Sequence, residues 1–223
     1  MTRRAPLLLL GVPFVLAVTA CAGRIAARSF PPASAQDVRE ALSAWDAAQA
    51  RAAGMAPSKL LYAAHMGTSG LPSVPGTLAV TYDGQRILTA SLTGPFGSRI
   101  AEYRDGAVTG EDREAFIVDP EAMRSVLAGV WLGAPTAVAG RDGSDCLLTW
   151  EGTYRVDAVI DVREQKLRSL RVAGSGGRLE ATYSGGLNPW PQRVALKEEQ
   201  SGRSLSLTLL AAEPLEKGTM PLP

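Results

Sequence analysis

The chain has 223 residues, of which 46% are hydrophobic and 20% are charged, and its formal net charge is +1. A chain of this length and composition can build a substantial core within one domain. The near-neutral charge excludes the strongly basic class of nucleic-acid-binding proteins, so no nucleic-acid partner is expected. With only two cysteines, at positions 21 and 146, a disulfide framework is also excluded.

The first residues have the layout of a signal peptide. Arg3 and Arg4 precede an apolar stretch from Ala5 to Val18, and small residues then lead directly to Cys21. This position of the cysteine resembles the lipobox of bacterial lipoproteins, which implies that Cys21 carries a diacylglycerol and a further acyl chain. Two or more chains anchor a protein stably in a bilayer. An ordinary secretory signal followed by an accidental cysteine is the alternative.

These observations divide the chain into four parts. We expect a signal peptide at residues 1–20, a lipidated tether at 21–33, a globular domain at 34–213 and a C-terminal tail at 214–223. Ser34 and Asp37 form a capping-box pattern at the start of the domain. The helix that follows carries an apolar stripe, and Gly54 is expected to end it as a left-handed cap. The stripe comprises Val38, Ala41, Leu42, Trp45 and Ala48.

From Lys59 onward the apolar period changes to two, which predicts β-strands. Asp83-Gly84 and the Asp-Gly pair at 105–106 are hairpin signals. Clear alternation returns at 154–162, 179–183 and 205–209. Antiparallel strands that each have one apolar face must curl or stack to cover that face.

A second helix is expected to interrupt the strands. Asp119 is a suitable N-cap, Pro120 fits the first helical position, and Gly133 with Pro135 is expected to end the helix. Its apolar stripe comprises Met123, Val126, Leu127, Val130 and Trp131. The fold class is therefore α+β, mainly β: a strongly curved antiparallel sheet, or incomplete β-barrel, that covers an internal helix.

The sequence offers little support for catalysis. His65 is the only histidine, and the spacings of metal ligands, of a nucleophile elbow and of a phosphate-binding loop are absent. The pattern at 174–177 predicts a turn, and 142–145 predicts a solvated connection. Cys146 begins an apolar strand and is expected to act as a small hydrophobe. We therefore predict that the chain is not an enzyme and uses no metal or cofactor.

Several segments resemble, in the right order, the outer-membrane lipoprotein receptor LolB, within the wider LolA/LolB-like fold. The likeness begins at Leu88–Ser98, where a strand runs into a Gly-Pro-Phe-Gly loop, and continues to Tyr103. It includes the helix and Gly-x-Pro turn between Ala115 and Pro135. It resumes at Ala181–Gly186 and at Pro191–Leu209. The region His65–Gly76 departs from the family because it is richer in glycine and proline.

The resemblance implies a curved sheet that encloses an apolar cavity between strands and helices. Members of the family accept the acyl chains of lipoproteins from a soluble periplasmic carrier, LolA, and release them into the outer membrane without a cofactor. The partners expected here are therefore lipoprotein acyl chains or another lipid, a LolA-like carrier and the outer-membrane bilayer, and we expect a monomer. The candidate cavity-lining residues are Met123, Val126, Leu127, Trp131, Trp150, Val156 and Ile160.

The loop Gly94-Pro95-Phe96-Gly97 is the candidate membrane-contacting site. By resemblance, Phe96 matches the family's exposed leucine on the loop that touches the membrane. Burying a phenylalanine among acyl chains is worth about 2–3 kcal/mol. The alternative is that Phe96 folds back onto the core.

Three functions are consistent with the sequence. The first is a receptor on the periplasmic face of the outer membrane, anchored at Cys21; Ala22 agrees, because aspartate at this position marks inner-membrane retention in many Gram-negative bacteria. The second is a lipoprotein on the same scaffold that binds a lipid or glycolipid, or helps to assemble an envelope complex, without exchange with a carrier. The third is an envelope hydrolase, which would need His65 within a polar triad.

Overall fold

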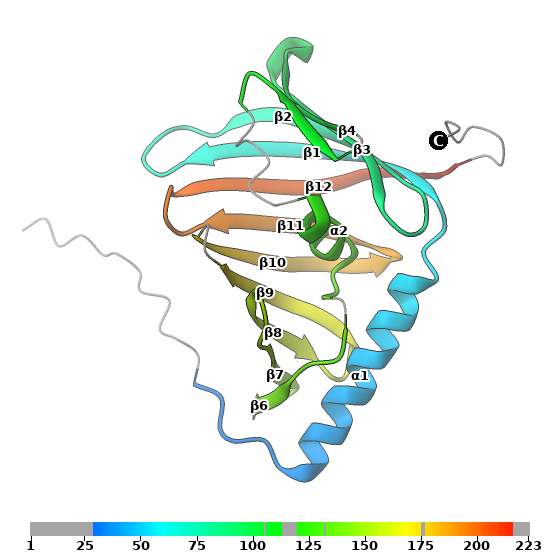
Figure 1. Ribbon diagram of the computed structural model, residues 1–223, viewed down its shortest axis with the longest axis vertical. Coiled ribbons are helices and arrows are strands. Elements are labelled where there is room, and N and C mark those ends of the chain that lie inside the picture. Colours follow the sequence, from blue (N-terminus) through cyan, green and yellow to red (C-terminus); the bar gives the residue numbers. More distant parts are fainter. Residues whose placement is uncertain (1–28, 105, 113–119, 132, 175–176, 216–223) are drawn as a thin grey trace, which may run out of the picture.

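The computed structural model describes residues 29–104, 106–112, 120–131, 133–174 and 177–215, so the expected signal peptide, Cys21 and Asp119 lie outside the described residues. The described residues form one twelve-stranded sheet that is curved and not closed into a barrel (Figure 1). The strand order is β5-β4-β3-β2-β1-β12-β11-β10-β9-β8-β7-β6. Its strands are β1 (Ser58–Thr68), β2 (Val74–Tyr82), β3 (Ile87–Thr93), β4 (Arg99–Arg104), β5 (Ala107–Gly110), β6 (Ala137–Asp142), β7 (Asp145–Trp150), β8 (Arg155–Asp161), β9 (Lys166–Gly174), β10 (Gly177–Asn188), β11 (Trp190–Glu198) and β12 (Arg203–Pro214).

Every neighbouring pair in this sheet is antiparallel. Tyr82 and Ile87 pair across the predicted Asp83-Gly84 hairpin, and β11 and β12 pair across a turn at 199–202. β1 pairs with β12 as well as with β2, so the last strand joins the two halves of the sheet. The alternation of apolar and polar residues therefore identified most of the strands correctly.

The first helix, α1 (Ala35–Ala53), has the predicted capping box. The Asp37 amide donates to the Ser34 hydroxyl, and the Asp37 carboxylate accepts from the Ser34 amide. The buried face of α1 packs on β6 to β9, but Leu42 lies on its exposed side. Gly54 has φ −84° rather than a left-handed conformation, because its amide continues the helical pattern to Ala50 and Arg51.

The second helix, α2 (Pro120–Ala128), is shorter than predicted. Gly129 has a φ of +65°, its amide donates to the Val126 carbonyl, and the Val130 amide donates to the Ser125 carbonyl. These bonds form a Schellman motif, which ends the helix before Val130 and Trp131. The prediction that the helix reaches Gly133 is therefore wrong, because the glycine that ends it is Gly129.

Two ion pairs of Arg141, with Asp37 and Glu40, join the start of α1 to the edge strand β6. The Arg141 guanidinium lies 2.5 Å from the Asp37 carboxylate and 2.6 Å from that of Glu40. The Arg141 amide also donates to the Pro31 carbonyl, at 2.9 Å. The chain that leads from the expected lipid anchor therefore joins the fold beside β6.

Candidate functional site

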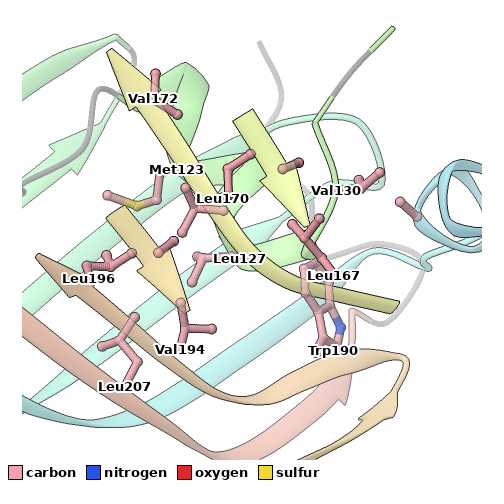
Figure 2. Packing of buried hydrophobic residues seen from close by; sticks show 14 of the residues in the cluster. Met123, Leu127, Val130, Leu167, Leu170, Val172, Trp190, Val194, Leu196 and Leu207 are labelled. Atoms are coloured by element: carbon pink, nitrogen blue, oxygen red, sulfur yellow. The ribbon is translucent and has the colours of Figure 1, made fainter. Parts of the chain in front are cut away.

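The concave face of the sheet is covered by α2 and by apolar side chains from both halves of the sheet. Figure 2 shows Met123 and Leu127 of α2 among side chains of β9, β11 and β12. Six of the candidate cavity-lining residues are buried in this core; they are Met123, Val126, Leu127, Trp150, Val156 and Ile160. Trp131 is partly buried against the same core, beyond the end of α2. The structure thus brings the candidate lining residues to one apolar interior.

The segment after α2 is held by hydrogen bonds to a single carbonyl. The Gly133 carbonyl accepts from the indole of Trp45 at 3.1 Å, from the amide of Gln49 at 2.7 Å and from the indole of Trp150 at 3.3 Å. The rings of Trp45 and Trp150 also pack edge to face, with centroids 4.9 Å apart. These contacts attach the chain between α2 and β6 to both α1 and β7.

A hollow of about 340 Å³ lies between the two helices. Small side chains of α1 form one wall, and α2 and the following turn form the other. The residues that border it are Asp46, Gln49, Ala50, Ala52, Ala53, Arg124, Ser125, Ala128 and Val130. The hollow reaches the edge of the apolar interior at Val130.

The Gly94–Ser98 loop links β3 to β4 and carries Phe96 outward. The Phe96 side chain is fully exposed, at 108% of its reference area, and its backbone has φ +60° and ψ +20°. Gly97 follows with φ +77°, and the Gly94 amide donates to the Ser98 carbonyl at 2.8 Å, which closes the loop. A left-handed conformation is unfavourable for a bulky residue, so the loop holds Phe96 away from the core at some cost in stability.

Two more exposed apolar side chains lie at the same end of the sheet. Leu71, in the loop between β1 and β2, is 69% exposed, and Val74, at the start of β2, is 43% exposed. β1 and β3 run in the same direction, so the loops that follow these two strands lie at the same end of the sheet. We call Leu71, Val74 and Phe96 the apolar rim.

A hollow of about 250 Å³ opens beside the apolar rim. Leu71, Val74 and Ile100 form its apolar side, and Arg203 lies 3.8 Å from Asp112 on its polar side. Sequence reasoning identified Phe96 but missed Leu71 and Val74. The available signal was an apolar residue within the Gly- and Pro-rich segment 67–76: Leu71 lies in the loop between two strands, and Val74 is the first residue of β2.

The two side chains considered for polar chemistry, His65 and Cys146, do not border the hollow beside the apolar rim. His65 is exposed on the outer face of β1, with Ser206 of β12 as its cross-strand neighbour. Cys146 is a buried free cysteine, and its burial raises the pKa of the thiol, so the thiol stays protonated. Within the residues that the structure describes, no group of three or more histidine, cysteine or carboxylate side chains could hold a metal ion. None of the helices in the described ranges is both long and apolar enough to cross a membrane.

No family model and no curated protein matches the chain. Among solved structures, a LolA superfamily protein from Nitrosomonas europaea is similar, with a TM-score of 0.52 and 9% identity over 78% of this chain and 94% of that chain. A putative outer membrane lipoprotein-sorting protein domain from Vibrio parahaemolyticus has a TM-score of 0.51 and 11% identity, over 82% of this chain and 95% of that chain. At such low identity the likeness concerns the fold, and it confirms the curved, unclosed antiparallel sheet expected from the sequence. The apolar cavity expected inside that sheet stays a prediction. The chain has a LolA/LolB-like fold.

Proposed function

We propose that this chain is an outer-membrane lipoprotein, anchored at Cys21, that binds acyl chains of lipoproteins between α2 and the sheet and passes them into the bilayer. The observation that carries the proposal is the apolar rim at the end of an apolar-lined, curved sheet. The LolA/LolB-like fold supports it, because the similar solved structures include a LolA superfamily protein and a putative lipoprotein-sorting domain.

The interior can accept acyl chains if α2 moves. The helix spans nine residues in the part of the chain that the structure describes, and its buried face packs through flexible aliphatic side chains such as Met123 and Leu127. A displaced α2 would leave the buried side chains on the strands that it contacts, β3 and β11, facing an open apolar space. Acyl chains entering that space would replace the contacts that α2 gives up.

The apolar rim suits the release step. Phe96 is exposed, held outward by its loop and adjacent to the hollow that Leu71 and Val74 border. Inserting Phe96 among lipid tails would recover about 2–3 kcal/mol from its apolar surface. We propose that the loop Gly94-Pro95-Phe96-Gly97 contacts the membrane while an acyl chain leaves the protein.

A delivery assay tests this proposal. The full chain is reconstituted in vesicles and supplied with an acylated lipoprotein on a LolA-like carrier, and transfer into the bilayer is measured. Phe96→Glu should keep the wild-type melting temperature but abolish transfer. Leu210→Glu is the matched control, because Leu210 is 59% exposed on β12, outside the rim. Normal delivery by Phe96→Glu would contradict the role of the loop.

The alternative is a lipoprotein that binds a lipid or glycolipid, or helps to assemble an envelope complex, without carrier exchange. The departure of residues 65–76 from the LolB pattern favours it, because the resemblance that implies exchange with a carrier does not extend to this segment. The same segment contributes Leu71 and Val74 to the apolar rim. Native mass spectrometry of the purified chain separates the two. A retained lipid that a carrier cannot displace supports the alternative, whereas exchange with a loaded carrier supports the receptor.

A further inference from the structure

Two tyrosine hydroxyls are buried on the concave side of the sheet, and neither has a hydrogen-bond partner among the described residues. They belong to Tyr62 on β1 and Tyr183 on β10. Tyr62 lies on the same face of β1 as the buried Leu60 and Ala64, and Tyr183 lies two residues after the buried Ala181 on β10. Both therefore point into the interior that α2 covers.

An unpaired buried hydroxyl destabilises a fold, so most buried hydroxyls have partners. This chain provides a direct contrast, because the buried Tyr82 donates its hydroxyl hydrogen to the Gly84 carbonyl at 2.6 Å. Tyr62 and Tyr183 have no such acceptor within the described residues. Burial raises the pKa of both hydroxyls, so they remain protonated and available as donors.

The cross-strand neighbours of the two tyrosines include apolar residues. The cross-strand neighbours of Tyr62 are Leu78 and Leu209, and the cross-strand neighbour of Tyr183 on β11 is Val194. Tyr183 also lies below the end of α2, since a methyl group built on Gly129 would be 3.9 Å from its ring. Displacement of α2 would therefore expose the Tyr183 ring to an incoming ligand.

The charge of the interior limits what that ligand can be. Among the described residues, the buried polar ones are Ser58, Ser125 and Asp161. Asp161 is paired with Arg168 at the end of β8, at 2.6 Å, so no buried charge remains to neutralise an ionic ligand group. A ligand for this interior needs apolar chains and neutral hydrogen-bond acceptors.

We propose that Tyr62 and Tyr183 donate hydrogen bonds to the carbonyl oxygens of ester- or amide-linked acyl chains bound between α2 and the sheet. The proposal rests on the proposed function and specifies its ligand. The two tyrosines are three strands apart, in the order β1, β12, β11 and β10, which separates their backbones by about 14 Å. They therefore serve two carbonyls, which fits a ligand with more than one acyl chain.

A pair of probes that differ only in their carbonyl groups tests the inference. The chain as expressed, with Cys21→Ser so that it carries no acyl group, is titrated with dioctanoylglycerol and with dioctylglycerol, the ether that lacks both carbonyls. Binding is followed by tryptophan fluorescence. The ester should bind more tightly than the ether, and Tyr62→Phe and Tyr183→Phe should each weaken ester binding about five- to tenfold without changing ether binding. Tyr82→Phe is the matched control and should leave the preference for the ester unchanged.

Thermal unfolding without ligand provides the second readout. Tyr62→Phe and Tyr183→Phe should keep or raise the melting temperature, whereas Tyr82→Phe should lower it. A lower melting temperature for the first two variants would show that the hydroxyls are already paired, and this would overturn the inference. Equal binding of ester and ether by the wild type would overturn it too, while leaving the proposed function intact. Binding of neither probe would instead contradict the proposed function.

Discussion

The two halves of the sheet differ in the contacts and the exposure of their side chains. The half formed by β6–β9 is covered by α1, and the ion pairs of Arg141 join α1 to β6. Trp45, Gln49 and Trp150 also donate hydrogen bonds to the Gly133 carbonyl. The half formed by β1–β5 ends in the apolar rim, where Phe96 is exposed in a left-handed conformation. The side chains of one half therefore make internal contacts, whereas the other half leaves apolar side chains exposed.

This difference indicates where stability and function can be separated. Substitutions in the β6–β9 half should reduce the free energy of unfolding before they affect lipid contact. Substitutions in the apolar rim should alter lipid contact and leave stability unchanged or higher. The following variants test that separation, beginning with the largest expected effect.

Trp45→Ala should cause the greatest loss. Trp45 is 1% exposed, packs edge to face on Trp150 and donates to the Gly133 carbonyl. Removing a buried tryptophan ring costs about 3–5 kcal/mol. Urea unfolding followed by circular dichroism measures the change. Leu42→Ala on the exposed side of the same helix is the control, and an equal loss there would contradict the packing described for α1.

Asp161→Asn should cost about 1.5–3 kcal/mol at neutral pH. Burial alone would raise the pKa of Asp161, but the amides of Arg163 and Glu164 and the Arg168 guanidinium together lower it below its usual range. A lowered pKa in the folded state stabilises the protein above the unfolded-state pKa, and this contribution is lost as the pH falls through the folded-state pKa.

The pH dependence distinguishes this explanation from a general packing defect. The stability difference between wild type and Asp161→Asn should shrink as the pH falls through the unfolded-state value, near 4, toward the lower folded-state pKa. Thermal unfolding at several pH values measures it. A difference that stays constant across this range would show that the carboxylate charge contributes nothing.

Phe96→Gly should have the smallest effect on stability, and in the opposite direction. Glycine adopts φ +60° without steric cost, so the variant should be more stable by about 1 kcal/mol, while vesicle binding is lost. Phe96→Ala keeps the unfavourable backbone conformation and should lose vesicle binding without gaining stability. Differential scanning calorimetry and vesicle co-flotation measure the two effects, both on the Cys21→Ser background, which carries no acyl anchor. A loss of stability in Phe96→Gly would mean that Phe96 packs on the protein.

The sequence predicted the features that depend on local patterns. The alternation at 154–162 located β8, although Tyr154 lies before the strand, and the capping box at Ser34 located the start of α1. The framing of Phe96 by Gly94, Pro95 and Gly97 predicted an exposed loop, and the structure places Phe96 in solvent.

The remaining features could not be predicted from the pattern of residue types. The end of α2 was misplaced because Gly129 and Gly133 are both plausible caps, and the hydrogen bonds that distinguish them are visible only in the fold. The unpaired hydroxyls of Tyr62 and Tyr183 were invisible because alternation identifies a buried face but not the acceptors that reach it. The Gly133 contacts join residues far apart in the chain, so no local pattern predicts them.

The central claim is that acyl chains occupy the space between α2 and the concave face of the sheet. Photo-crosslinking tests it most directly: the full chain is incubated with vesicles that contain a diacyl lipid with a diazirine near the end of one acyl chain, and labelled peptides are mapped. Labels are expected on α2, around Met123 and Leu127, and on the facing strands β9 and β11. Labels confined to the outer face of the sheet, or absent from α2, would contradict it.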